Sequence, residues 1–395
     1  MKWFIDILTV WRYEFKRIIH DEGVLVFFLA VPLLYPLLYS YLYNNEIVTE
    51  VPAVVVNDSH SSLSREFIRK VDATADIRIV AQCADMEEAK EMLHRNEAYA
   101  IVYIPSSFDN KLSEGQQATI NVYSDMSGFL YYKAIYSACV EVSLDMNSDI
   151  KAEHLNGATD KQIKTFSYPI EYRYVPMFNT QSGFASFLIP AVLILIIQQT
   201  MVLGVGMLAG DERERIKKGK SIYSSNDNKP IQIVLGRAGA YWGIYAIISA
   251  YLVCIIPLIF NLVHIWQWKT LLPFMSIYIT ACVFFSMTLS ILSHDRESLI
   301  LVFVFMSIPL LFMSGLSWPV QSMPLIWKTL SHLFPSTFGI TGYIRISEMG
   351  AVTTDIHYEL IALCVQSVVY FITTCILYRR RYRKTRFALN KELLS

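Results

Sequence analysis

Charged residues are scarce in this 395-residue sequence. Asp, Glu, Lys and Arg make up 17% of it and apolar residues 54%, whereas a soluble globular protein has about 25% charged residues. This composition excludes an ordinary soluble protein and favours one that lies largely within a membrane. The sequence also lacks basic patches interleaved with aromatic residues, so we do not expect nucleic acid to be a partner.

The motifs of common membrane enzymes are missing as well. The sequence contains neither the HExxH pattern of zinc metalloproteases nor the GxSxG pattern of serine hydrolases. Gly219-Lys220-Ser221 resembles the end of a phosphate-binding loop, but that motif needs a glycine where Glu214 stands. We therefore predict no catalytic residue, no metal and no cofactor, and we expect any ATP hydrolysis to occur in a partner subunit.

The six cysteines show no metal-binding spacing. Four of them lie in apolar runs, where cysteine usually acts as a small buried hydrophobic residue. Cys83 and Cys139 fall in an acidic segment and would be able to form a disulfide if that segment is extracytoplasmic. Their spacing does not decide whether they pair.

The apolar run from Phe184 to Gly210 contains no charged residue and exceeds the roughly 20 residues that a helix needs to cross a bilayer. It is followed at once by the charged segment DERERIKKGK, from Asp211 to Lys220. Because Lys and Arg stay on the cytoplasmic side of a span, this helix is expected to run from the outside to the cytoplasm.

Further apolar runs extend this pattern to six transmembrane helices. They are predicted at 23–43, 184–209, 238–260, 271–292, 298–316 and 358–378. Segment 317–357 is apolar but interrupted by prolines, so we expect an outer re-entrant segment of short helices there. The runs contain almost no titratable residue, which argues against an ion-coupled carrier.

The N-terminal segment 1–22 is predicted to be a cytoplasmic amphipathic helix. Aromatic and aliphatic residues recur on one side of it at helical spacing, with cations elsewhere, as in a helix that lies in the membrane interface. An ordinary packed amphipathic helix is the alternative. Segment 379–395 is a basic tail, and segment 211–237 is a charged loop between the second and third helices.

The distribution of basic residues predicts the orientation. The N-terminal arm, the 211–237 loop, the turn after the fourth helix and the C-terminal tail carry 19 Lys and Arg, whereas the two short loops on the other side carry three. This asymmetry follows the positive-inside rule and places both termini in the cytoplasm.

Segment 45–180 differs from the rest because it is acidic, with 12 Lys and Arg against 20 Asp and Glu. Strand patterns alternate with helix patterns, which indicates a small α/β domain. Strands are predicted at 52–56, 77–81, 98–105 and 118–124, and helices at 63–71, 86–95 and 128–155. The predicted fold is thus a polytopic α-helical membrane protein with an extracytoplasmic α/β domain inserted between the first two transmembrane helices.

The outer segment carries a recognisable order of residues. Ser314-Gly315-Leu316, Trp318-Pro319, Met323-Pro324, Trp327, Pro335 and Gly342 to Arg345 follow one another there. This order resembles the permeases of type-2 ATP-binding-cassette (ABC) exporters, and the similarity extends over nearly the whole chain. The resemblance assigns Gly315, Pro319, Met323, Pro324, Pro335 and Arg345 to the outer re-entrant motif of such permeases.

The resemblance also implies partners and a coupling site. Such permeases dimerise in the bacterial inner membrane and bind ABC ATP-binding subunits on the cytoplasmic side. The N-terminal helix and the 211–237 loop would receive the motion of the ATPase, with Glu212, Arg213, Glu214 and Arg215 as the coupling contacts. The second permease subunit would be an identical or a sister chain, and the large outer domain suggests a periplasmic membrane-fusion adaptor.

Two other classes of function remain open. The chain would be a receptor or scaffold if the outer domain binds a partner and the helices serve only as anchors. A membrane enzyme is the third class, and it lacks support from any motif. The substrate of a permease is not readable, because lipids, drugs and peptides all suit an apolar path.

Overall fold

In the computed structural model, the structure is described for residues 2–44, 47–154, 159, 165, 175, 177–180, 183–217, 230–292 and 298–392. The chain forms two compact units. The helical unit comprises Met1–Glu46 and Pro176–Ser395, and the sheet unit comprises Ile47–Val175. Each unit is described by itself below.

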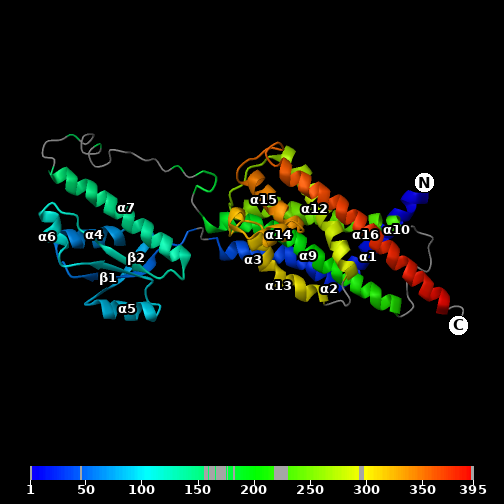
Figure 1. The fold of residues 1–395 in the computed structure, drawn as a ribbon, viewed down its shortest axis with the longest axis horizontal. Coiled ribbons are helices and arrows are strands. Elements are labelled where there is room, and N and C mark those ends of the chain that lie inside the picture. Colours follow the sequence, from blue (N-terminus) through cyan, green and yellow to red (C-terminus); the bar gives the residue numbers. More distant parts are fainter. Residues whose placement is uncertain are drawn as a thin grey trace. The chain divides into compact units, whose positions relative to one another are not determined.

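The helical unit begins with α1, and a continuous helical stretch follows it after Asp21 (Figure 1). This stretch consists of α2, a π-helical turn η1, and α3. The bounds in the first half of the unit are α1 Lys2–His20, α2 Glu22–Leu25, η1 Val26–Ala30, α3 Val31–Leu42, α9 Phe184–Lys217, α10 Pro230–Ala250, η3 Tyr251–Ile255 and α11 Ile256–Ile259. The second half consists of α12 Trp268–Leu292, α13 Ser298–Met313, the short turn η4 Val320–Ser322, α14 Leu325–Ser331, α15 Pro335–Ser347 and α16 His357–Glu392.

Five helical stretches within the described residues are long and apolar enough to cross a membrane. They are Glu22–Leu42, Phe184–Ile216, Pro230–Ile259, Trp268–Ile291 and His357–Arg381. The predicted helix at 298–316 corresponds to α13, whose 16 residues include Pro309. Its apolar part in the described residues, Phe303–Met313, is shorter than a span. The sixth span therefore stays a prediction.

Both π-helical turns come directly before a proline. Pro32 stands at the start of α3 after η1, and Pro257 stands at the start of α11 after η3. Proline has no N–H to donate to the preceding turn, and its ring crowds the carbonyl four residues earlier. A widened turn relieves that crowding without ending the helix. The π turn η1 is the local irregularity that accompanies Pro32 in the first apolar helix.

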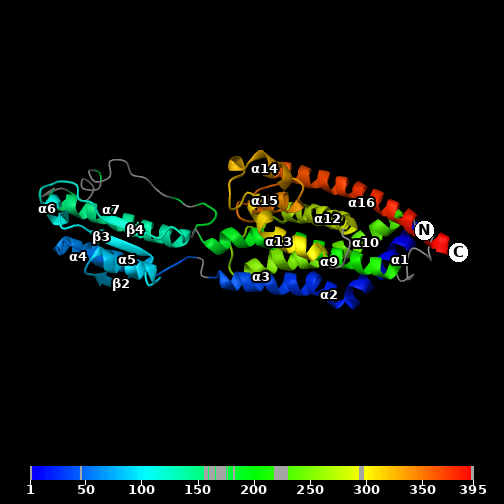
Figure 2. The same cartoon turned by 60° about the horizontal axis from the view of Figure 1, so that its bottom comes forward.

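Helix α9 is the central element of the helical unit. It packs against α3, α12, α13 and α15, and most of its apolar part is buried (Figure 2). A helix that is apolar on all sides has no preferred solvent face, so burial by neighbours on every side is the arrangement that its sequence favours. Tyr278 of α12 donates a hydrogen bond of 2.7 Å to the carbonyl of Ile194, which ties α12 to the middle of α9.

The sheet unit contains a mixed four-stranded sheet in the order β2-β1-β3-β4. β1 Val51–Asn57 pairs in parallel with β2 Ile77–Cys83 and with β3 Ala100–Ile104, and β4 Asn121–Ser124 is antiparallel to β3. The helices are α4 Ser62–Asp72, α5 Met86–His94, α6 Phe108–Ser113 and α7 Phe129–His154. The strands and helices predicted from the sequence are confirmed, and α6 is an additional helix.

The two faces of this sheet form separate cores. Helices α4 and α7 cover one face of the sheet and α5 covers the other (Figure 1). Val55 of β1 packs with residues of α4 and α7, including Cys139, whereas Val54 and Val56 pack with residues of α5 and with Cys83. Alternate side chains of a strand point to opposite faces, so the two cysteines are separated by the sheet itself. Both are free thiols in the structure, which rules out their pairing in this fold.

Candidate functional site

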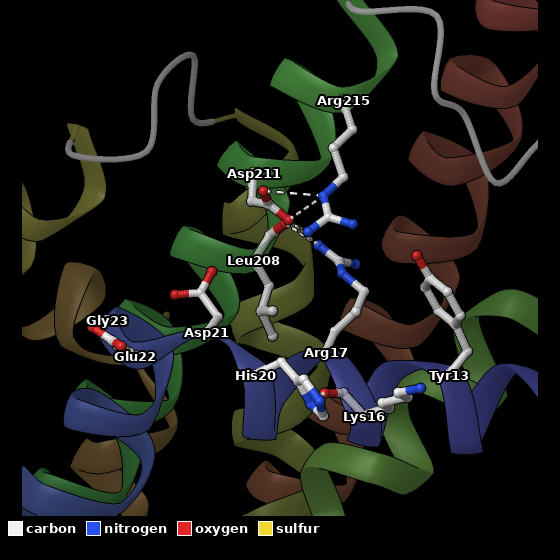
Figure 3. A pocket seen from close by; sticks show the side chains of 10 residues that line it. All are labelled: Tyr13, Lys16, Arg17, His20, Asp21, Glu22, Gly23, Leu208, Asp211 and Arg215. Atoms are coloured by element: carbon white, nitrogen blue, oxygen red, sulfur yellow. Dashed lines mark hydrogen bonds and ion pairs between the residues drawn. The ribbon is translucent and has the colours of Figure 1, made fainter.

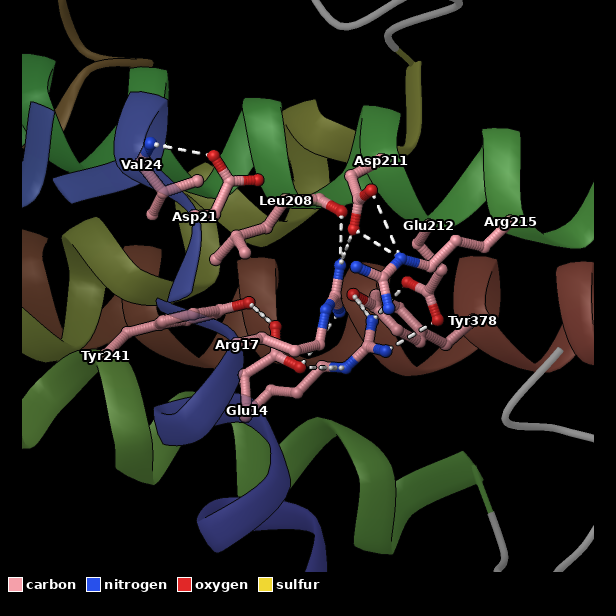
Figure 4. A network of polar contacts seen from close by, with 11 residues as sticks. Glu14, Arg17, Asp21, Val24, Leu208, Asp211, Glu212, Arg215, Tyr241 and Tyr378 are labelled. Carbon is pink, nitrogen blue, oxygen red and sulfur yellow. Dashed lines mark hydrogen bonds and ion pairs between the residues drawn. The ribbon is translucent and has the colours of Figure 1, made fainter. Parts of the chain in front are cut away.

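The residues with unusual chemistry in the helical unit gather where α9 reaches its charged end. Four charged residues there are almost fully buried: Glu14 and Arg17 of α1, Glu212 of α9 and Arg237 of α10 (Figure 4). Their exposed fractions are 1%, 7%, 3% and 4%. We call these four residues the charge network.

Glu212 and Arg237 form the shortest pair of this network. The two guanidinium nitrogens Nη2 and Nη1 of Arg237 donate to the two carboxylate oxygens of Glu212, at 2.6 and 2.7 Å. This two-pronged geometry is the strongest that a carboxylate and an arginine form. Arg237 also lies 3.5 Å from the carboxylate of Glu14 through its Nε atom. The pair therefore joins α9 to α10 and reaches α1.

Arg17 makes the second set of contacts between α1 and α9. Its Nη1 donates to Glu14 at 3.2 Å, and its Nη2 donates to the carbonyl of Leu208 at 2.9 Å and to Asp211 at 3.0 Å. The carbonyl of Leu208 lies near the end of the apolar part of α9. The side chain of Arg17 thus holds the N-terminal helix against the point where the second span becomes charged.

Two tyrosines complete the network. Tyr241 of α10 donates a hydrogen bond to Glu14, and Tyr378 of α16 accepts one from Arg237 at 3.2 Å. The guanidinium of Arg237 also lies over the Tyr378 ring, 5.6 Å from its centroid. The network holds two acids and two bases, so its charges balance within the protein. This balance matters because removing one partner of a buried ion pair lowers the stability of a protein by on the order of 3–5 kcal/mol.

Helix α1 contacts α10 through small residues. A Cβ atom added at Gly236 would lie 2.7 Å from the Cβ of Val10 and 2.9 Å from the backbone oxygen of Ile7, and one added at Gly239 would lie 3.3 Å from the Trp11 ring. Glycine at these places lets the two helices approach closely. The packed side of α1 therefore runs through Ile7, Val10 and the charge network.

The apolar side that the sequence predicted for α1 is only partly buried. Ile18 is buried, whereas Phe4 and Leu8 are 72% and 50% exposed. One edge of α1 is thus packed on α10, and the other carries exposed apolar residues. That this exposed edge lies in the membrane interface stays a prediction.

The four residues proposed for coupling occupy different environments on α9. Glu212 is buried in the charge network. Arg213 donates to the carbonyls of Ser290 and Ile291 at the end of α12, at 3.2 Å for Ser290. Glu214 is exposed, and Arg215 is exposed and paired with Asp211 at 2.9 Å. The helices also reach further into segment 211–237 than expected, and its middle, 218–229, lies outside the described residues.

The outer motif residues lie at the ends of short helices. Gly315 follows α13 with a φ of +89°, a value that favours glycine, and a Cβ there would lie 2.5 Å from Val320. Pro319 and Met323 flank the turn η4, and Pro324 precedes α14. Proline is well suited to these positions because it cannot continue the preceding element. The expectation of short helices in this segment is confirmed.

Helix α15, which begins at Pro335, is the buried helix of this outer segment. It packs against α9, α12 and α16. The side-chain oxygen of Gln198 on α9 accepts a hydrogen bond of 2.6 Å from the backbone N–H of Ser336, one of the N–H groups that a helix start leaves without a partner. At its other end Arg345 forms a 2.8 Å ion pair with Glu359 of α16. The cap and the ion pair fix both ends of α15.

Comparison with known proteins agrees with this architecture. The family model described as ABC-2 family transporter protein matches residues 23–376, which is most of the chain. The chain belongs to the ABC-2 family of transporter proteins. It is also similar to Nodulation protein J of Rhizobium leguminosarum bv. trifolii, with 28% identity over 121 residues. That match covers 30% of this chain and 46% of Nodulation protein J, so it spans less than half of that relative.

Membership of the ABC-2 family makes this chain a transport-related, multi-pass membrane protein. It does not favour the receptor or scaffold alternative. No group of His, Cys, Asp and Glu in the described part of the chain is arranged to hold a metal ion.

The sequence reading missed most of the charge network. It identified Glu212 as a coupling contact without predicting its burial, and it placed Arg237 at the end of a loop. The signal for Arg237 was its position directly before an apolar run, since a charge there is costly unless it is paired. The signal for Glu14 and Arg17 was their i, i+3 spacing, which places them on one side of a helix.

Proposed function

We propose that this chain is the permease subunit of an ATP-driven exporter. It pairs with a second permease subunit to form the translocation path and couples to separate ATP-binding subunits on the cytoplasmic side of the bacterial inner membrane. Membership of the ABC-2 family supports a transport role. The charge distribution along the sequence supports the proposed orientation, with both termini in the cytoplasm and the sheet unit outside.

The charge network is the observation that carries the coupling part of this proposal. It joins α1, α9, α10 and α16 through side chains that are almost fully buried. Buried paired charges hold a fixed geometry, because any displacement would leave a charge without compensation. A push on α1 or on the exposed end of α9 would therefore move these four helices together.

The exposed residues Glu214 and Arg215 are then the direct contacts for an ATP-binding subunit. Glu212 acts one step behind them, by linking the same turn of α9 to Arg237. Arg213 joins this turn to the end of α12 through the carbonyls of Ser290 and Ile291. In this arrangement Glu214 and Arg215 contact the ATP-binding subunit. Glu212 and Arg213 transmit its motion to α10 and α12.

The outer segment is proposed to close the translocation path on the far side. Helix α15 is held by Gln198 in the middle of α9, and α9 carries the coupling residues near its C-terminal end. One continuous helix of 34 residues, about 50 Å long, therefore contacts both the proposed docking face and the outer motif. The sheet unit is proposed to contact a periplasmic membrane-fusion adaptor.

The docking role is tested by charge reversal at the exposed end of α9. Full-length tagged chain is purified from its host membrane, and the bound ATP-binding subunit is quantified by mass spectrometry. We expect Glu214→Lys with Arg215→Glu to reduce the amount bound by about tenfold or more, because charge complementarity would become repulsion. Lys269→Glu serves as the matched control. Lys269 is exposed at the start of α12, whereas Arg213 contacts the end of that helix, so this reversal should leave binding unchanged.

Two outcomes would contradict the proposal. Purification of the chain without any ATP-binding subunit, at a normal membrane level of the chain, would remove the ATP-driven mechanism. An equal loss of binding in the Lys269→Glu control and in the double reversal would remove the docking role of Glu214 and Arg215.

A further inference from the structure

The elbow between α1 and α2 contains a cavity of about 760 Å³ that the proposed function does not use. Lys16, His20 and Arg17 of α1, Asp21 and Glu22 at the elbow, and Leu208, Asp211 and Arg215 of α9 line it, together with Tyr13 and Gly23 (Figure 3). The first span begins at Glu22, and the apolar part of α9 ends just before Asp211. The cavity therefore lies at the depth of the lipid headgroups.

Charges of the two signs are separated within the cavity. In the view of Figure 3, the carboxylates of Asp21 and Glu22 lie to one side of the guanidinium groups of Arg17 and Arg215. Arg17 and Arg215 already pair with Asp211, at 3.0 and 2.9 Å. Within the described part of the chain, Lys16 and Glu22 form no ion pair. The cavity thus offers one available cation and one available carboxylate.

An apolar path leads away from the carboxylate side. Val26, Leu29 and Leu33 follow Glu22 along the first span and are 47%, 40% and 36% exposed. On the other side the aliphatic floor of the cavity is Leu208. Exposed aliphatic side chains below a polar pocket are suited to an acyl chain that lies along the helix, since only hydrocarbon gains by covering them.

We propose that this cavity binds the headgroup of phosphatidylethanolamine from the cytoplasmic leaflet. The phosphate is held by Lys16 and the edge of Arg215, and the ammonium group is held by Glu22. An acyl chain lies along Val26, Leu29 and Leu33. The separated charges select a zwitterionic headgroup, because a purely anionic lipid would place its additional negative or neutral polar groups beside two carboxylates.

The primary ammonium distinguishes this lipid from phosphatidylcholine. An ammonium group donates three hydrogen bonds to carboxylates, whereas a quaternary ammonium donates none. The site is therefore expected to prefer phosphatidylethanolamine over phosphatidylcholine. It is expected to prefer it over phosphatidylglycerol too, since that headgroup leaves Glu22 without a cation.

Native mass spectrometry of the detergent-solubilised full-length chain tests this assignment. The protein is titrated with the three lipids, all with the same acyl chains, and with glycerophosphoethanolamine, which has the headgroup but no acyl chain. We expect phosphatidylethanolamine to bind about tenfold more tightly than the other two lipids, as the loss of one charge-assisted hydrogen bond would give. The headgroup compound alone, and inorganic phosphate as a competitor, should have no measurable effect.

Three variants separate the contacts. Glu22→Gln should abolish the preference over phosphatidylcholine while leaving phosphatidylcholine binding unchanged. Lys16→Gln should weaken all three lipids by a similar factor, because all three carry the phosphate. Arg12→Gln removes an exposed cation of α1 that does not line the cavity and should change nothing.

Several results would overturn the proposal. Equal affinity for the three lipids in the wild-type chain, or a preference for phosphatidylglycerol, would remove the zwitterionic site. Displacement of the lipid by inorganic phosphate would point to a free anion site instead. An effect of Arg12→Gln as large as that of Lys16→Gln would show only general attraction between the basic helix and lipid.

Discussion

At the scale of single residues, the most informative feature is the pair formed by Glu212 and Arg237. Both side chains are almost fully buried, and their two hydrogen bonds are 2.6 and 2.7 Å long. The desolvation cost of such a pair is nearly as large as its attraction, so the pair contributes little net stability as a whole. Replacing only one residue of the pair is strongly destabilising, because the remaining charge stays buried next to Glu14 and Arg17 without its partner.

We predict that Arg237→Met destabilises the chain by about 3–5 kcal/mol, since it leaves two buried carboxylates against one cation. The double variant Glu212→Gln with Arg237→Met should be less destabilised than Arg237→Met alone, because Glu14 and Arg17 then balance each other. Apparent melting temperatures in detergent measure both. Arg215→Met removes a half-exposed cation, and its partner Asp211 keeps its ion pair with Arg17, so this control should cost less than about 1 kcal/mol. Additive effects of the two network substitutions would contradict the coupling of their charges.

A second prediction at this scale concerns the cysteines of the sheet unit. Burial raises the pKa of the Cys139 thiol to about 11, and burial together with nearby Glu88 and Asp85 raises the pKa of the Cys83 thiol. A raised pKa keeps a thiol protonated at pH 8, and the thiol form is a poor nucleophile. Both residues of the native full-length chain should therefore react with iodoacetamide far more slowly than after denaturation. Peptide mapping of the labelled chain measures this, and an intact disulfide between them in unreduced protein would contradict the fold of the sheet unit.

Residue types alone allowed part of this to be predicted. The sequence showed that Glu212 to Arg215 form a charged cluster after an apolar run, and it left the cysteine pairing open. It did not show that Glu212 faces inward, because the side on which a helical residue is buried depends on the helices around it. The partner Arg237 comes 25 residues later on another helix, and only the packing of α10 beside α9 brings them together.

At the scale of elements, the contact between α1 and α10 depends on glycines of α10. Gly236→Ala would place a methyl group 2.7 Å from Val10 and 2.9 Å from the backbone oxygen of Ile7. Backbone atoms move only with their helix, so α1 must shift. Gly243 lies on the same helix, and a Cβ there would meet nothing within 4 Å. It therefore provides a matched control.

We predict that Gly236→Ala loosens α1 and increases hydrogen–deuterium exchange in peptides covering residues 2–20. Gly243→Ala should leave that exchange unchanged and should stabilise α10 by roughly 0.5–1 kcal/mol, because alanine favours a helix more than glycine does. Exchange in α1 that is the same in both variants would show that the close approach at Gly236 is unimportant.

Most elements were predictable because their patterns are long and uniform. The apolar runs gave the helices now seen as α9, α12 and α16, and the alternation of short strands and helices gave β1 to β4 with α4, α5 and α7. Boundaries were less predictable. Helix α10 begins at Pro230 although its first two turns contain Gln232 and Arg237, since both polar side chains find partners on neighbouring helices. The sequence of one helix does not contain that information.

At the scale of the whole molecule, the account depends on where the energy for transport comes from. The predicted transmembrane runs contain almost no titratable residue, whereas four almost fully buried charged residues form a paired network near the end of α9. An ion-coupled carrier needs titratable or ion-binding side chains in its path. The arrangement instead suits a permease that is moved by a partner at its cytoplasmic face, as the ABC-2 family membership also favours.

The division of the chain into membrane helices and a separate sheet unit was predictable from the sequence, whereas the contacts that link α9 to α15 were not. Composition indicated a membrane protein, and the acidic segment 45–180 indicated a separate unit. The link from α9 to α15 through Gln198 and the backbone of Ser336 depends on a contact between residues 138 positions apart in the sequence. No periodicity or motif marks Gln198 as the residue that caps that helix.

Reconstitution in liposomes tests the central claim most directly. The full-length chain is incorporated either alone or with the ATP-binding subunit that copurifies with it, and the flux of a panel of fluorescent lipids and hydrophobic dyes is measured. The account predicts flux with ATP only when both components are present, and none from the chain alone under a proton or sodium gradient. Accumulation of any of these compounds by the chain alone, driven by an ion gradient, would contradict it.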